Sequence, residues 1–148
     1  MKTVLAAGVF DLLHYGHIRY LEESKKAGGP GAKLVVIVAR DETVRKLKGH
    51  EPVIPEDQRR AVIESLKVVD EALLGYEEMD LVRVIEHIRP DIVVMGHDQQ
   101  SIKTQVEKVN KVLGSNIQVY QLPQFGEDDL NSTSKIKRRI VEEARTRS

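Results

Sequence analysis

Short apolar segments alternate with longer segments of mixed polarity along most of the chain. Apolar runs of four to seven residues predict buried strands, because the central strands of a parallel sheet are covered on both faces. We predict five strands, at residues 3–7, 33–39, 71–74, 91–95 and 117–122. The run KLVVIVA, from Lys33 to Ala39, is long enough for a central strand of such a sheet.

Helical spacing of apolar residues fills the intervals between these runs. We predict helices at residues 18–27, 42–47, 55–67, 81–88, 102–113 and 135–145. Asp41 is a candidate N-cap for the second helix, and Pro55 suits the first turn of the third, whose Ala61, Val62 and Leu66 are expected to face inward. This alternation of strands and helices indicates an α/β fold, with a parallel sheet covered by helices on both faces.

Length and composition predict one domain over residues 1–148, with about two-thirds of the unfolded surface buried. Lysine plus arginine (23) equals aspartate plus glutamate (23), so the chain lacks the overall basic field that supports nucleic-acid binding. The absence of cysteine excludes disulfides, thiolate catalysis and cysteine-ligated zinc. No apolar run approaches the thickness of a bilayer, and the N-terminus lacks the apolar core of a signal peptide. We therefore expect a cytoplasmic protein without a nucleic-acid or membrane partner.

The segment GVFDLLHYGH, between the first strand and the first helix, has the clearest chemical signal. His14 and His17 lie three residues apart at a helix start, where they share one face and where free backbone N–H groups favour an anion. Gly8 allows a tight exit from the strand, and Gly16 leaves room for a ligand against the first turn. A His-x-x-His pair also occurs as solvated or core histidines. Its position between strand and helix favours a phosphate-binding site.

This segment resembles the H-x-G-H signature of the nucleotidylyltransferase superfamily, preceded by that superfamily's G-x-F-D. Within the superfamily the chain is most similar to the archaeal FAD synthases, through VIVARDETVRKLKG at 36–49, PEDQRR at 55–60 and VVDEALLG at 68–75. The resemblance covers residues 3–138. It implies a single-domain, doubly wound, Rossmann-like sheet of five parallel strands in the order 3-2-1-4-5. In that order the first and fourth strands are neighbours, and their following loops face a shared ligand crevice.

The resemblance also implies roles for residues in this crevice. His14 and His17 would be catalytic, binding the triphosphate of a nucleotide and stabilising the charge that develops on it. The remaining nucleotide-binding residues would be Gly8, Val9, Phe10, Tyr15, Gly16, Gly96, Asp98, Ser132, Thr133 and Ser134. The substrate-binding residues would be Asp11, Lys46, Lys48 and Arg59. No residue is assigned as a dedicated metal ligand, although Asp11 is a candidate to orient the site or help hold a metal.

Several of these residues have a structural alternative. Gly96 and Asp98 also fit a glycine turn with an Asx cap, Lys46 and Lys48 also fit a solvated surface, and Arg59 also fits a structural salt bridge. The hydroxyls at 132–134 also fit simple helix capping. The chain departs from its relatives before these hydroxyls: many of them have an arginine there, whereas residues 124–130 contain none and include three acidic residues. Lys135, Lys137 or another basic residue would then take that arginine's role.

The resemblance implies transfer of an AMP group from ATP to the phosphate of FMN, which yields FAD and pyrophosphate. A divalent cation, expected to be Mg²⁺, would bridge the triphosphate oxygens. A homodimer is a further family expectation. The flavin ring is expected to rest on aliphatic groups and on the loop around Phe125.

Two other functions remain open on the sequence. One is a cytidylyltransferase that uses CTP and glycerol 3-phosphate or another phosphorylated polyol. The other, from a different class, is a non-catalytic nucleotide-binding sensor on the same kind of fold. A sensor would not need paired histidines aimed at the transferred phosphate.

Overall fold

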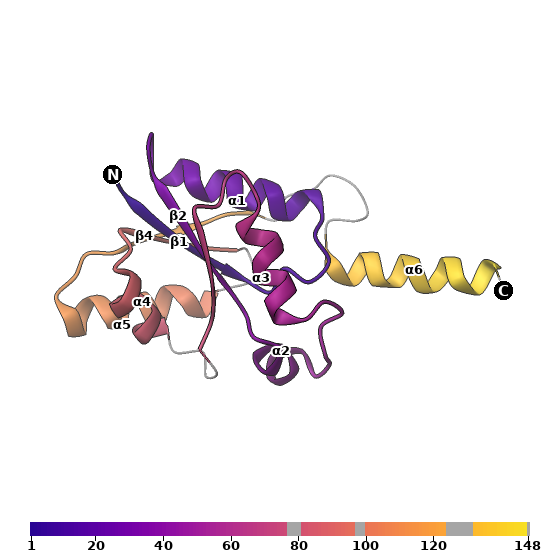
Figure 1. The fold of residues 1–148 in the computed structure, drawn as a ribbon. Helices are drawn as coiled ribbons and strands as arrows, with labels where there is room; N and C mark the ends of the chain where they lie inside the picture. The colour runs from indigo at the N-terminus through magenta and orange to yellow at the C-terminus, as the bar shows by residue number, and fades with distance from the viewer. Residues whose placement is uncertain (77–80, 97–99, 124–131, 148) are drawn as a thin grey trace.

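The structure, a computed structural model, describes residues 1–76, 81–96, 100–123 and 132–147. Within these residues one parallel sheet is formed by β1 (Thr3–Gly8), β2 (Lys33–Val38), β3 (Glu71–Leu74), β4 (Ile92–Met95) and β5 (Gln118–Gln121). The strands lie in the order β3-β2-β1-β4-β5 (Figure 1). The predicted fold class and strand order are therefore confirmed.

All six predicted helices are present, with shifts at their ends. They are α1 (Tyr15–Ala27), α2 (Asp41–Lys48), α3 (Glu56–Glu64), α4 (Leu81–Ile88), α5 (Gln100–Leu113) and α6 (Thr133–Arg147). The prediction of Asp41 as an N-cap is wrong, because α2 begins at Asp41 and Arg40 occupies the cap position. A carboxylate from α3 instead satisfies the first amide of α2: Oε1 of Glu56 accepts the N–H of Asp41 at 3.0 Å.

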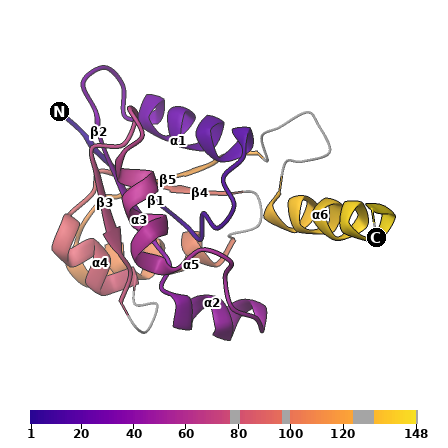
Figure 2. The same ribbon diagram turned by 45° about the vertical axis from the view of Figure 1, so that its right-hand side comes forward.

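The core forms two layers, one on each face of the sheet. Leu34, Val36 and Val38 of β2 pack with the layer that contains α1 and α3, whereas Val35 and Ile37 pack with the layer that contains α4 and α5. Successive side chains of a strand point to opposite faces, so an uninterrupted apolar run serves both layers. Figures 1 and 2 show these two pairs of helices on opposite sides of the sheet.

Two helices lie outside these layers. In both views α6 extends away from the sheet toward the C-terminus, and none of its described residues is buried. α2 follows β2 and is capped after Lys48 by Gly49, whose φ of 76° is the left-handed conformation that glycine adopts without strain. Among the described residues, no helix combines the length and apolar character needed to cross a bilayer.

Candidate active site

A cavity of about 560 Å³ lies where the loops after β1 and β4 meet the starts of α1 and α6. These loops come together because β1 pairs with β4, with Val4 opposite Ile92 and Leu5 opposite Val93. The winding direction reverses between these strands, which is the usual ligand crevice of a doubly wound fold. The predicted site residues that line the cavity are Gly8, Val9, Phe10, Asp11, His14, Gly16, His17, Lys48, Gly96, Ser132, Thr133 and Ser134.

Three predicted site residues do not line this cavity. The side chain of Tyr15 is mostly exposed, and Lys46 is 61% exposed and paired with Glu42 on its own helix at 3.6 Å. Arg59 is buried elsewhere, as shown below. Asp98 lies outside the described residues, as do Phe125 and the acidic segment that precedes α6.

His14 and His17 form a stacked pair at the start of α1. Their ring centroids are 3.8 Å apart, with 26° between the planes. The backbone N–H of His14 donates to Nδ1 of His17 at 3.3 Å, which fixes the orientation of the second ring. His14 occupies the N-cap position with an extended φ of −136°, and His17 is the third residue of the helix. The two imidazoles therefore lie beside the free amides of a helix N-terminus.

Phe10 packs against the His17 ring of this pair. Its ring meets that of His17 edge-on, with centroids 5.4 Å apart and 66° between the planes. A Cβ on residue 8 would lie 2.8 Å from two atoms of the Phe10 ring, so this aromatic contact requires the glycine at that position. Phe10 itself has a φ of 52°, a strained conformation for a residue other than glycine. Such strain at a cavity wall is typical of functional sites.

His17 is a neutral hydrogen-bond donor at physiological pH. Burial, His14 and the charge of Lys48 lower the pKa of His17 from 6.5 to about 4. Because Nδ1 accepts the amide proton of His14, the neutral ring carries its own proton on Nε2. That N–H can donate to a phosphate oxygen without a prior protonation step.

The lowered pKa predicts a pH-dependent stability. His17 takes up a proton near pH 6.5 in the unfolded chain but only near pH 4 in the folded protein. The free energy of unfolding is therefore highest above pH 6.5 and decreases as the pH falls from 6.5 toward 4. With a folded-state pKa of about 4, the loss amounts to about 2 kcal/mol at pH 5. Urea unfolding at pH 7 and pH 5 should show this loss in the wild type and not in His17→Asn. His87→Asn, at an exposed position on α4, should behave like the wild type; equal losses in all three proteins would contradict the prediction.

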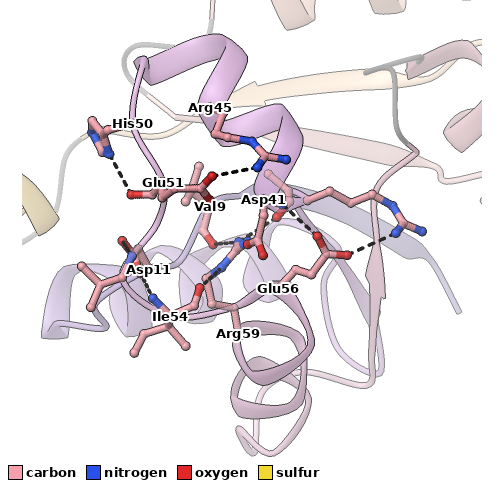
Figure 3. Close-up of polar contacts among 12 residues, drawn as sticks. Val9, Asp11, Asp41, Arg45, His50, Glu51, Ile54, Glu56 and Arg59 are labelled. Carbon is pink, nitrogen blue, oxygen red and sulfur yellow. Dashed lines mark hydrogen bonds and ion pairs between the residues drawn. The ribbon is translucent and has the colours of Figure 1, made fainter.

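The carboxylate of Asp11 accepts two hydrogen bonds from the loop that precedes α3. Its Oδ2 accepts the N–H of Val53 at 2.9 Å and its Oδ1 accepts the N–H of Ile54 at 2.8 Å (Figure 3). Lys137 on α6 lies 3.3 Å from Oδ2. Burial opposes ionisation of Asp11, but the two amide hydrogen bonds and Lys137 together lower its pKa below the usual value. Asp11 is therefore a fixed anion whose two oxygens are already engaged by the protein.

Arg59 connects three segments of the chain: the one after β1, the one after β2 and the loop before α3. Its guanidinium donates to the carbonyls of Ile54 (2.8 Å), Val9 (2.9 Å) and Ala39 (2.7 Å) and pairs with Asp41 at 2.6 Å (Figure 3). Its side chain is fully buried. The structure thus favours the salt-bridge alternative, and the expectation that Arg59 reaches the acceptor substrate is corrected. Arg59 instead holds together the segments that follow β1 and β2.

The buried face of α3 also differs from the prediction, because it contains Arg59. Ala61 and Val62 are exposed, whereas Arg59 and Ile63, four residues apart, are buried. A helix presents positions i and i+4 to the same neighbour, so the face toward the sheet contains a cation at its first position. The prediction is therefore wrong for Ala61 and Val62, whereas Leu66, just after α3, is partly buried and packs against the core as expected.

The start of α6 brings hydroxyls and a lysine to the cavity. Oγ1 of Thr133 donates to the carbonyl of Leu12 at 3.2 Å, which attaches α6 to the histidine segment. Oγ of Ser132 accepts the N–H of Lys135 at 3.2 Å, so the capping alternative holds for this residue while its neighbours also line the cavity. Lys137 lines the cavity as well and was only one of several candidates in the sequence.

Sequence reasoning did not assign several other residues of the lining. These are Ala7, Tyr20, Val44, Leu47, His50 and Pro123. Leu47 carried a sequence signal, because it is an apolar residue between Lys46 and Lys48. In the structure it is 68% exposed, and an exposed apolar side chain beside a cavity indicates a binding surface. The others lie on ordinary strand, helix or loop positions with no local pattern to distinguish them.

The cavity presents donors and cations rather than metal ligands. No cluster of three or more His, Cys, Asp or Glu side chains suited to a metal occurs within the described ranges. The lining instead offers three imidazoles (His14, His17 and His50), two lysines, three hydroxyl side chains at residues 132–134 and the N-termini of α1 and α6. Such a set binds a polyanion such as a phosphate chain.

An anion-binding cavity at this reversal of the winding agrees with the comparisons: the chain belongs to the cytidylyltransferase-like family, whose model matches residues 5–139. Relatives named FAD synthase include those of Aciduliprofundum boonei and Methanopyrus kandleri. They are 45% and 43% identical to this chain, over 96% and 95% of its length and 92% and 93% of theirs. A solved Thermoplasma volcanium structure, described as a lipopolysaccharide core biosynthesis protein, is 44% identical. Its TM-score is 0.75, over 85% of this chain and 99% of that one.

Proposed function

We propose that this protein is an FMN adenylyltransferase, which transfers the AMP group of ATP to the phosphate of FMN and releases pyrophosphate. The observation that carries the reaction class is the stacked His14–His17 pair, with a neutral N–H donor, at the start of α1. Similarity over nearly the full chain to proteins named FAD synthase supports ATP and FMN as the substrates.

The reaction needs positioning and charge stabilisation rather than a protein nucleophile. A phosphate oxygen of FMN attacks the α-phosphorus of ATP in line, and the bond from that phosphorus to the bridging oxygen breaks with its electrons going to pyrophosphate. The attacking phosphate is already anionic, so no general base is required. Nε2–H of His17, with His14 beside it, donates to oxygens whose charge grows in the transition state. Phe10 and the amide of His14 hold that donor in place before substrate arrives.

We propose Mg²⁺ as the cofactor, brought in by ATP. The oxygens of Asp11 are engaged by two amides and a lysine, so the described residues do not offer a carboxylate cage. Mg²⁺ commonly retains water and binds through substrate phosphates in such sites, where it neutralises phosphate charge.

Leu47 is the proposed apolar support for the flavin ring. Leu47 lines the cavity and is 68% exposed, three residues after the buried Val44 on the same helix. Covering a leucine side chain contributes about 1.5–3 kcal/mol. Leu47→Ser should therefore raise KM for FMN by about tenfold or more and leave KM for ATP nearly unchanged. Val112→Ser, at an exposed position on α5 outside the cavity lining, is the matched control in steady-state assays. An equal rise for both substrates would contradict this role.

A binding titration tests the choice of acceptor. FMN should bind saturably, in the micromolar range, when a non-hydrolysable ATP analogue is present, and glycerol 3-phosphate should not bind under the same conditions. Because the ring rests on aliphatic groups, binding should quench flavin fluorescence only weakly. Binding of glycerol 3-phosphate with CTP, and of FMN with neither nucleotide, would contradict the proposal.

We also propose that the protein acts in the cytoplasm as a homodimer without a nucleic-acid partner. The equal numbers of acidic and basic residues support the last point. The dimer rests on the family resemblance alone. Light scattering should give a molar mass about twice the 16.7 kDa of the chain; a monomer at micromolar concentration would contradict it.

A further inference from the structure

The last helix has an apolar stripe that the described part of the chain does not bury. Ile136, Ile140 and Ala144 recur at every fourth position of α6, so they lie along one side of the helix, and Val141 lies beside Ile140. Ile140 is 57% exposed and Val141 is 48% exposed. In both views α6 extends away from the sheet (Figures 1 and 2). An exposed apolar stripe of this kind marks an interaction surface.

Two contacts attach the start of α6 to the rest of the chain. Thr133 donates to the carbonyl of Leu12, and Lys137 pairs with Asp11. Residues 138–147 continue the helix with every residue exposed. A helix of about this length is marginal on its own in water, because most helical stability in proteins comes from packing an apolar face. A partner on the apolar stripe would supply that packing.

The charges at the edge of the stripe suit a second copy of the same helix. Arg139 and Glu143 lie one turn apart, at 3.7 Å from each other, on the side next to Ile136. When two copies of α6 lie antiparallel about a two-fold axis at Ile140, the same edges meet. Arg139 of each copy then lies near Glu143 of the other, and the larger Ile136 meets the smaller Ala144. The stripe and its charged edge are therefore self-complementary.

The same charges argue against a membrane as the partner of α6. Helices that lie on anionic lipid carry lysine and arginine on the polar face and an apolar face that enters the bilayer. On α6, Glu143 instead borders the apolar stripe and Glu142 precedes it. These carboxylates would face lipid head groups of the same sign, whereas a reversed copy of the helix offers them arginine.

We infer that α6 forms the subunit interface of a homodimer, in which its apolar stripe packs antiparallel on that of a second copy around Ile140. The inference rests on the homodimer of the proposed function and names the surface that forms it. Val53, which is 57% exposed, lies beside the first turns of α6, because Asp11 both accepts its N–H and contacts Lys137. The C-terminal end of an antiparallel partner helix reaches this position, where Val53 adds apolar surface.

Single cysteines test the interface and its direction, because the chain contains no cysteine. Ile140→Cys should give a disulfide-linked dimer on mild oxidation, since the two copies of this residue meet at the axis. Ile136→Cys and Ala144→Cys should each stay largely unlinked, because each lies about 12 Å along the helix from its own copy, but their mixture should link. Val112→Cys, at a position on α5 that is 79% exposed, is the control and should stay unlinked on a non-reducing gel.

Charge changes test the same interface without a covalent bond. Ile140→Glu should shift the mass in light scattering from the dimer to the 16.7 kDa chain at micromolar concentration, while circular dichroism still shows a folded protein. Arg139→Glu and Glu143→Arg should each weaken dimerisation by about tenfold or more, because like charges then meet. An equimolar mixture of these two variants should regain the dimer.

The inference is overturned by dimers that persist in Ile140→Glu, or by Val112→Cys linking as readily as Ile140→Cys. A monomeric wild type that binds vesicles of anionic lipid would overturn it as well. FAD formation, measured on the same samples, separates the interface from the reaction. An Ile140-linked dimer that makes no FAD supports the interface and contradicts the proposed function, whereas a monomer that makes FAD does the reverse.

Discussion

Replacing His17 by alanine is expected to lower kcat by about 10²- to 10³-fold while the protein stays folded. The ring supplies one N–H donor to the reacting phosphates, and losing one such donor typically costs that much in rate. His14→Ala should give a loss of similar size. Thermal unfolding should show Tm values close to that of the wild type, because both rings lie at a cavity wall rather than in the core layers.

Two further variants at residue 17 identify which atom matters. The amide nitrogen of glutamine lies near the position of Nε2, whereas that of asparagine lies near Nδ1. His17→Gln should therefore recover part of the rate lost in His17→Ala, and His17→Asn should not. Because the pKa of His17 is about 4, its substitution should not move the alkaline limb of the pH–rate profile. A folded His17→Ala with near-normal turnover would contradict the mechanism.

Replacing Arg59 by leucine is expected to lower the free energy of unfolding by about 3–5 kcal/mol. The change leaves Asp41 without its buried partner and three carbonyls without their donor. For a chain of this length Tm should fall by about 10 °C or more. Arg59→Lys should not restore stability, since an ammonium cannot span the same four acceptors.

A double-mutant cycle isolates the Arg59–Asp41 pair. If that ion pair dominates, Asp41→Asn combined with Arg59→Leu should cost less than the sum of the single changes. Arg60→Leu is the control: the side chain of Arg60 is 33% exposed and pairs with Glu64 on the same helix, and its loss should cost about 1 kcal/mol or less. A loss below about 1 kcal/mol in Arg59→Leu would show that these segments hold their positions without the guanidinium.

The strands and helices were accessible from sequence because each apolar run is bounded by glycine, proline or a polar segment. The two-sided burial of β2 follows directly from its uninterrupted run of apolar residues. Strand order did not follow from these patterns, since many orders satisfy the same alternation; it came from the family resemblance. The N-cap of α2 failed because its partner, Glu56, lies 15 residues along the chain and is unrelated to any local pattern.

The site residues that come from one short segment of the chain could be predicted from the sequence. Those whose position depends on contacts between distant segments could not. Phe10, His14 and His17 belong to one short segment, from the end of β1 to the first turn of α1, and they line the same cavity as expected. The resemblance assigned Arg59 to the acceptor substrate and left a structural salt bridge open; only the three carbonyls and Asp41, which come from other segments, explain its burial. The place of Lys137 in the cavity lining depends on where α6 attaches, and the hydrogen bond from Thr133 to Leu12, 121 residues away, contributes to that attachment.

A single competition assay tests the proposed function most directly. The purified protein is incubated with ATP, CTP, FMN and glycerol 3-phosphate together in the presence of Mg²⁺, and products are identified by mass while pyrophosphate is quantified. We expect FAD and pyrophosphate in equal amounts, and far less of both with His17→Ala. Formation of CDP-glycerol instead of FAD, or nucleotide binding without release of pyrophosphate, would contradict the assignment as an FMN adenylyltransferase.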